Sequence, residues 1–325
     1  MLSAPQAPQA EEYVESPVDI EVIVPTYQRP VELARCLEGL AEQSLQPSLV
    51  SAVVREGDQE SVELVRRGFG SLPLRVLTVY GTGVVAALNA AAEFARAPLL
   101  ALIDDDAIPP SRWLEDLARR MRESGAGIVC GRDILPLCAP SSANTRIGTI
   151  SWYGRTTGNH HVGAGPAREV ALFKGVNVLF RREFFLPPPP GLLRGSGAEV
   201  AWEIVTARRA TLRGAKLVYD PSITVHHFPA ARPGESARDC LSPTTVLDHA
   251  YNTFLAVSCY RPTWQVLVIL TYRLAVGARP EPGVVRAIAG VARRERTVAE
   301  RLRPALMGTT MGALSWWRLR RSLMP

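Results

Sequence analysis

Three consecutive aspartates, Asp104, Asp105 and Asp106, directly follow an apolar run over residues 99–103. Such a run, bounded by polar residues, is typical of a buried strand. Because the ligand crevice of an open α/β sheet lies at the carboxyl ends of its strands, the aspartates would meet there and repel one another. A divalent cation such as Mg²⁺ or Mn²⁺ prefers oxygen ligands and commonly carries phosphates. The alternative is a helix N-terminus, which also favours Asp. One Asp would serve as a cap, so the run favours a metal–phosphate site.

The composition is ordinary for a globular protein, but the charge is uneven. The 325 residues are 47% hydrophobic and 21% charged, with a net charge of +6. Residues 261–325 hold twelve arginines and three glutamates, a charge of +9, so residues 1–260 carry −3. A basic tail beside a mildly acidic body suggests contact with an anionic surface. The five cysteines form no CxxC pair, so we expect a reducing, cytoplasmic setting without a disulfide framework or a zinc site.

Neither end of the sequence predicts a membrane-spanning or secretory segment. Residues 1–18 are rich in Ala, Pro, Gln and Glu, lack the features of a signal peptide, and are expected to form a disordered leader. The longest apolar stretch, residues 264–276, is interrupted by Arg273. It is shorter than the roughly 20 residues that a spanning helix needs.

Strand and helix patterns alternate through the first half of the chain, which predicts a mostly parallel sheet with helices on both faces. Strands are expected at 20–24, 49–54, 74–79 and 99–103, and helices from Pro30, at 61–69, at 84–96 and at 111–124. In the second half we expect a long loop at 139–168, strands at 170–180 and 217–225, a helix at 199–212, and helices from about 244 to the end. No GxGxxG follows the first strand and no GxxxxGK[ST] occurs, which disfavours a dinucleotide dehydrogenase and a P-loop NTPase.

Taken in this order, the chain resembles the family 2 glycosyltransferases over about residues 19–230. The motifs that carry the resemblance are VIVPTYQR (22–29), the GxxxALNxA stretch from Gly83, LIDDDAIP (102–109), KGVNVLFRRE (174–183) and LVYDPSITVHHF (217–228). The resemblance implies a GT-A catalytic domain at 19–232, followed by a helical C-terminal region at 233–325. It also implies transfer of a sugar from a nucleotide diphosphate sugar to an acceptor hydroxyl, with inversion at the anomeric carbon.

The resemblance also implies a donor site. Asp106 would be the main ligand of a Mg²⁺ or Mn²⁺ ion, and Asp104 or Asp105 would reach the ribose. His227 would complete the metal site, with core packing as the alternative for this histidine. Where the family usually carries a carboxylate after the second strand, this chain has Arg55. The nucleobase is therefore left open, with Glu56 and Asp58 as neighbouring carboxylates that could substitute. The remaining residues assigned to nucleotide-sugar binding are Pro25, Thr26, Tyr27, Arg29 and Asn89.

Two glutamates compete for the role of catalytic base. The register of the resemblance places Glu203 at the base position, and Glu199 lies one helical turn earlier, so the two could share a face. The alternative is that one of them only favours the helix dipole. A third group of residues is assigned to sugar or acceptor contacts: Asn159, His160, His161, Lys174, Gly175, Asn177 and Trp202. For Gly175 and Asn177, expected on a strand, the alternative is a bulge or turn.

The C-terminal region combines an apolar stripe with Arg and Trp, as in Trp316-Trp317-Arg318. This pattern is typical of helices on an anionic membrane, and the alternative is packing on the catalytic domain. Membrane attachment would suit a lipid-linked acceptor, and no nucleic-acid partner is expected. Two rival functions remain: a catalytically silent nucleotide-sugar-binding module, and a Rossmann-type dehydrogenase. The donor sugar, the acceptor, the pathway and the oligomeric state are not predicted.

Overall fold

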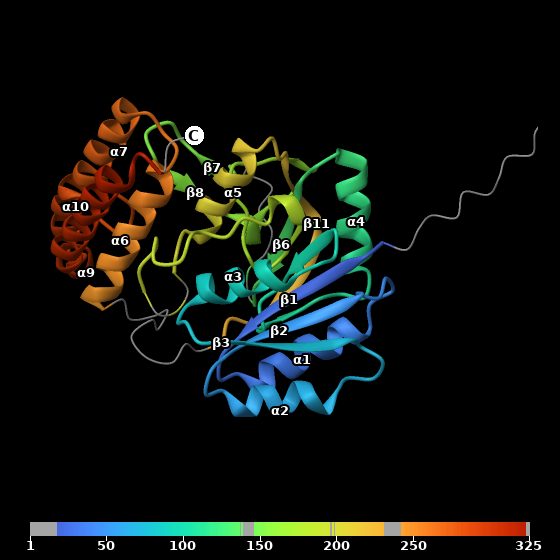
Figure 1. The fold of residues 1–325 in the computed structure, drawn as a ribbon. Helices are drawn as coiled ribbons and strands as arrows, with labels where there is room; N and C mark the ends of the chain where they lie inside the picture. Colours follow the sequence, from blue (N-terminus) through green and yellow to red (C-terminus); the bar gives the residue numbers. More distant parts are fainter. Residues whose placement is uncertain are drawn as a thin grey trace, which may run out of the picture.

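The computed structural model describes residues 18–136, 138, 146–195, 197, 199–230 and 242–322. Of the expected leader only Val18 is described, and the expected domain boundary at 232/233 also lies outside the described residues. The described part consists of one large sheet with helices on both faces and a group of C-terminal helices beside it (Figure 1).

Nine strands of the described residues form the large sheet, in the order β3-β2-β1-β4-β10-β6-β11-β5, with β9 pairing with β11. Strands β1, β2, β3 and β4 are mutually parallel, and β6 is parallel to β11. Strand β10 is antiparallel to both β4 and β6, so the ends of β4 and β6 still point the same way. The bounds are β1 Ile20–Thr26, β2 Leu49–Arg55, β3 Leu74–Val79, β4 Leu99–Leu102, β5 Ala107–Ile108, β6 Ile128–Ile134, β9 Arg168–Glu169, β10 Val178–Arg181 and β11 Leu217–His227.

Alternate residues of the strands enter two separate cores. Val22 and Val24 face helices α1 (Pro30–Ala41), α2 (Gln59–Arg67) and α4 (Trp113–Ser124). Ile23 faces α3 (Val84–Phe94) and α5 (Trp202–Leu212) on the other side. This placement follows from the two-residue period of a strand, which points successive side chains to opposite faces of the sheet. Because both faces are buried, the sequences of these strands are continuous apolar runs. Figure 1 shows α1 and α2 together below the sheet.

After α4, the structure departs from the expected elements at three main places. Strand β6, which lies in the middle of the sheet, was not predicted. The strand expected at 170–180 is wrong over most of its length, because only β10 forms and residues 174–177 make a turn before it. The long loop contains a small hairpin of β7 (Thr149–Ile150) and β8 (Thr156–Thr157), and the 3-10 helix η1 (His160–Val162).

The C-terminal helices are α6 (Pro243–Ser258), α7 (Thr263–Ala275), α8 (Val284–Ala292), α9 (Arg296–Glu300) and α10 (Leu302–Leu319). Phe254 of α6 and Ile269 of α7 belong to the core that covers the α3 and α5 face. The Trp316 side chain of α10 is buried, and its Nε1 donates to the Ser258 carbonyl at 3.1 Å. A Cβ on Gly308 would lie 2.1 Å from the Leu247 carbonyl oxygen, so α10 and α6 approach closely. Helices α6, α7 and α10 therefore pack on the domain formed by the sheet and its helices. Within the described residues, no helix has the length and apolar character needed to cross a bilayer.

Candidate active site

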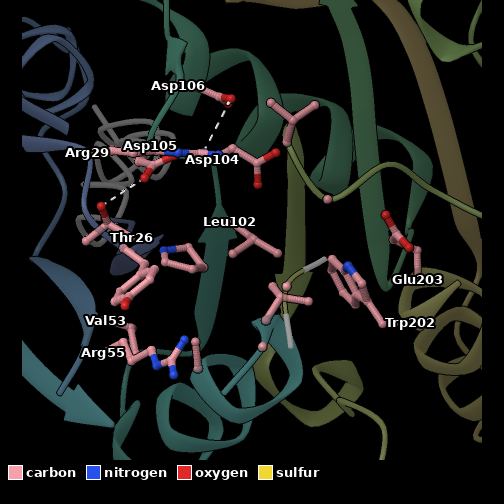
Figure 2. Close-up of a pocket in the computed structure, with 18 of the residues that line it drawn as sticks. Thr26, Arg29, Val53, Arg55, Leu102, Asp104, Asp105, Asp106, Trp202 and Glu203 are labelled. Atoms are coloured by element: carbon pink, nitrogen blue, oxygen red, sulfur yellow. Dashed lines mark hydrogen bonds and ion pairs between the residues drawn. The ribbon is translucent and has the colours of Figure 1, made fainter. Parts of the chain in front are cut away.

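A cleft of about 470 Å³ lies at the carboxyl ends of β1, β2, β3, β4 and β11, which meet at one edge of the sheet (Figure 2). This position is the one expected for a ligand site in an open α/β sheet. Twelve of the residues singled out in the sequence line it: Pro25, Thr26, Tyr27, Arg29, Asp104, Asp105, Asp106, Lys174, Gly175, Trp202, Glu203 and His227.

Asp104, Asp106 and His227 form a possible metal site, with one ligand atom from each residue lying within 4.8 Å of the others. The sheet brings them together, because β5 follows the aspartates directly and pairs antiparallel with the end of β11, which puts Ala107 opposite His227. The Phe228 amide also donates to the Asp106 carbonyl at 2.9 Å. Two carboxylates and an imidazole suit a divalent ion such as Mn²⁺. The ligand set therefore fits the expected cofactor.

A chain of alternating charges extends from this site. His227 Nε2 lies 3.2 Å from Asp106 Oδ1, and His227 Nδ1 lies 3.3 Å from Asp133 Oδ2. Asp133, at the end of β6, is fully buried and also pairs with Lys174. Burial disfavours the ionised form of Asp133, but the contacts with His227 and Lys174 keep its pKa below the usual value. For His227, burial is outweighed by bonds to Asp106 and Asp133, which raise the pKa.

Asp133 was missed in the sequence because no strand was expected there. The apolar run Ile128-Val129-Cys130, which follows the helix-ending Gly125, was the available signal. A carboxylate on the second ring nitrogen fixes the orientation and tautomer of a metal-binding histidine. Asp133 therefore leaves the Nε2 side of His227 facing Asp106 and the cleft.

Asp105 has a different environment from its two neighbours. Its carboxylate accepts from Thr26 Oγ1 at 2.8 Å and from Arg29 Nη1 at 3.0 Å. Burial is the main cause that raises the pKa of Asp105 to about 7. Arg29 also lies 3.6 Å from Asp106 Oδ2. Asp105 and Arg29 thus link the loop after β1 to the end of β4. In Figure 2 the Asp104 carboxylate turns the other way, toward the side of the cleft with Trp202 and Glu203.

Glu203 lies in the first turn of α5 and lines the cleft. Burial raises the pKa of Glu203 to about 7 and the charge of Asp104 adds to the rise, while Lys174 and a hydrogen bond from the Gly175 backbone oppose it. A Cβ on Gly175 would lie 2.5 Å from the Trp202 ring, so glycine is needed for α5 to approach this turn. A carboxylate that titrates near neutral pH is suited to accept a proton from a hydroxyl group.

Glu199 does not share a helix face with Glu203, contrary to the expectation. Helix α5 begins only at Trp202, because Glu199 (φ 38°) and Ala201 (φ 76°) have left-handed backbones. The Glu199 carboxylate accepts from the Val85 amide at 2.7 Å, and therefore caps the N-terminus of α3. Burial raises the pKa of Glu199 to about 7, against the effect of the Val85 hydrogen bond.

Several predicted contact residues lie outside the cleft, in hydrogen-bonded structural positions. Asn177 is fully buried and accepts from Trp113 Nε1 at 2.8 Å, while its amide donates to the Ile223 carbonyl at 3.1 Å. His160 is buried against Tyr219, with Nε2 3.2 Å from the Leu172 carbonyl. Burial lowers the pKa of His160 to about 4. These placements correct the expectation that Asn177 and His160 contact the sugar or the acceptor.

The other residues outside the cleft have similar explanations. Asn89 donates to the Val85 and Pro188 carbonyls at 2.8 Å and 2.9 Å. The carboxylate of Asp58 caps α2 by accepting from the Ser61 amide at 3.2 Å. The remaining members of this group are Glu56, which is exposed, and Asn159 and His161, which are partly buried near η1.

The sequence profile of glycosyl transferase family 2 matches residues 21–160, which include the aspartate run and the first half of the sheet. Over these residues the chain is similar to glycosyl transferase family 2. The dehydrogenase alternative is therefore wrong, and the antiparallel β10 inside the sheet also departs from a doubly wound dinucleotide fold. No protein of curated function matches the sequence of this glycosyltransferase.

Solved structures similar to the glycosyltransferase support a GT-A-like fold. S. aureus TarS, in complex with UDP-GlcNAc, has a TM-score of 0.51 at 16% identity, over 78% of this chain and 71% of that one. The mannosyltransferase PcManGT from Pyrobaculum calidifontis, in complex with GDP-Man and Mn²⁺, has a TM-score of 0.51 at 17% identity, over 96% and 89%. GalNAc-T7 with UDP, GalNAc and Mn²⁺ has a TM-score of 0.59 at 14% identity, over 80% of this chain and 51% of that chain.

Proposed function

We propose that this glycosyltransferase uses a nucleotide diphosphate sugar and a divalent ion, and transfers the sugar with inversion to an acceptor hydroxyl. The observation that carries the proposal is that one cleft holds both the Asp104, Asp106 and His227 cluster and a carboxylate with a pKa near 7, Glu203. The first can neutralise a leaving diphosphate, and the second can accept a proton.

In this proposal Asp104, Asp106 and His227 hold the Mg²⁺ or Mn²⁺ ion. When bound, the ion supplies charge stabilisation for the departing diphosphate oxygens. Asp133, which is itself paired with Lys174, fixes the orientation of the His227 ring through its contact with Nδ1. The loop Pro25-Thr26-Tyr27 contacts the nucleoside, and Asp105 with Arg29 holds that loop in place.

Glu203 acts as general base in this scheme. Its carboxylate takes the proton from the acceptor hydroxyl while the hydroxyl oxygen attacks the anomeric carbon and the bond to the diphosphate breaks. A single displacement with no covalent intermediate inverts that carbon. Trp202 and the turn at Lys174 and Gly175 border the space beside Glu203, so we assign these residues to sugar or acceptor contacts.

The test is turnover of UDP- and GDP-sugars with Mn²⁺, measured as release of the nucleoside diphosphate and, for the product, as the anomeric configuration by NMR. Donor hydrolysis or transfer that needs the metal and gives the inverted anomer supports the proposal. A retained anomer would contradict the mechanism. Nucleotide-sugar binding without turnover against a panel of hydroxyl acceptors would favour the silent binding module instead.

We also propose that the C-terminal region attaches the enzyme peripherally to an anionic membrane on its cytoplasmic side. Helices α6, α7 and α10 each pack one face on the rest of the fold, although Trp264 of α7 and Trp317 of α10 remain exposed. Helix α8 presents Val285, Ile288 and Val291 on one face, at 59%, 64% and 61% exposed. Isolated exposed apolar residues are common, whereas a continuous helix face is not. The surrounding charge is complementary to acidic lipids, since residues 261–325 carry +9. Such attachment would place the cleft near a lipid-linked acceptor.

A further inference from the structure

Arg55 is the last residue of β2 and lines the cleft at the end away from Glu203. The parallel register pairs Thr26 with Val54, which brings the next residues, Tyr27 and Arg55, side by side. The Arg55 guanidinium carbon lies 4.6 Å from the centroid of the Tyr27 ring, a distance that allows a cation–π contact. In Figure 2 Arg55 and Val53 lie on the far side of the cleft from Asp106.

This end of the cleft is where the nucleobase belongs if the proposed function is right. The metal cluster fixes the diphosphate near the ends of β4 and β11, and Glu203 marks the side of the transferred sugar. The nucleoside must then extend the opposite way, toward β1, β2 and β3. The cleft-lining residues of β1, β2 and β3, apart from Arg55 and Thr26, whose hydroxyl donates to Asp105, are apolar: Pro25, Val53 and Val79.

No carboxylate of the described residues lines this end. Glu56 is exposed and outside the cleft. The carboxylate of Asp58 accepts hydrogen bonds from the backbone amides of Gln28 at 2.5 Å and Ser61 at 3.2 Å. It therefore holds the loop after β1 and caps α2. Neither neighbour therefore substitutes for the carboxylate that the sequence lacks at position 55. The base faces a guanidinium, which only donates hydrogen bonds.

We propose that Arg55 selects a guanine nucleotide, so that the donor is a GDP-sugar; this inference rests on the proposed function. Guanine presents two adjacent acceptors, O6 and N7, which match the paired donors of an arginine. Uracil presents its N3–H donor between two carbonyls, and a donor-only partner leaves that N–H unpaired. The Tyr27 ring holds the guanidinium in place, which lowers the entropy lost when the two bonds form.

The experiment measures binding of GDP, UDP, CDP and ADP to the full chain in the presence of Mn²⁺, by isothermal titration calorimetry. A bidentate arginine contact should favour GDP over UDP by roughly 5- to 150-fold. Arg55→Ala should remove most of that preference, because it weakens the binding of GDP and leaves the affinity for UDP nearly unchanged. Arg55→Lys keeps the positive charge but lacks the paired, coplanar N–H donors of the guanidinium, so it should keep only part of the preference for GDP.

The matched control is Arg66→Ala, which removes an exposed arginine of α2 outside the cleft and should change neither affinity. Thermal unfolding of each variant checks that the fold is intact. Tighter binding of UDP, CDP or ADP than of GDP would overturn the inference and leave the proposed function standing. An equal loss of affinity for all four nucleotides in Arg55→Ala would also overturn the inference. Failure of all four nucleotides to bind would instead overturn the proposed function, and the inference with it.

Discussion

Replacement of Glu203 by Gln tests the proposed base most directly. Glutamine keeps the size of the side chain, and its amide oxygen can still accept the hydrogen bond from the Gly175 backbone, but it cannot take a proton. General base catalysis typically contributes about 10²- to 10⁴-fold, so kcat should fall by at least ~10² while the affinity for the donor is kept. At about 1.4 kcal/mol for each tenfold step, this corresponds to about 3–5 kcal/mol in the activation barrier.

The pH dependence gives a second measure of the same group. With a pKa of about 7, Glu203 is largely ionised at pH 8 and largely protonated at pH 6. Because only the ionised form accepts a proton, wild-type kcat should rise with pH and differ by about tenfold between these two values. Burial also gives Asp105 and Glu199 pKa values of about 7, so the wild-type profile alone does not assign the group.

Two variants make the assignment. In Glu203→Gln the residual activity should no longer change with pH through this range, whereas Glu199→Gln should keep both the pH profile and most of the activity. The assay is steady-state release of the nucleoside diphosphate at saturating donor from pH 5.5 to 8.5. If Glu199→Gln loses the profile and Glu203→Gln keeps it, the capping role of Glu199 does not describe its function and the assignment of the base is reversed.

Three further predictions follow from the cluster, the α3 cap and the α8 face. Asp106→Asn should abolish turnover and weaken Mn²⁺ binding, measured by electron paramagnetic resonance, because the ion loses a charged ligand; full activity of this variant, or of the wild type in EDTA, would contradict the metal site. Glu199→Ala should lower the free energy of unfolding by about 0.5–2 kcal/mol through loss of the α3 cap, measured by urea denaturation; an unchanged midpoint would reject that role. The double variant Val285→Ser/Ile288→Ser should reduce sedimentation of the full chain with anionic liposomes, whereas Val31→Ser, at an exposed position on α1, should not; equal pelleting of all three proteins would reject α8 as the membrane-binding face.

Much of the site was already determined by local sequence. The aspartates could be placed at the edge of the sheet because an apolar run predicts a buried strand, and the end of a strand in this kind of sheet is a ligand position. The resemblance to the family placed Glu203 at the base position, because the register could be counted along a short, continuous segment. The first four strands and their helices were predictable for the same reason, since each has a local apolar period.

Only the tertiary structure decided how the polar residues divide between function and support. Glu199 and Val85 are 114 residues apart in the chain, and His227 and Asp133 are 94 apart, so no local pattern relates them. Asn177 and His160 have side chains suited to sugar binding, yet folding buries them, and a buried polar group must be hydrogen-bonded within the protein. The same requirement commits Asp58 to the cap of α2 and leaves Arg55 facing the cleft. The sequence by itself determined which groups could do chemistry, and long-range hydrogen bonding decided which of them remain available to a ligand.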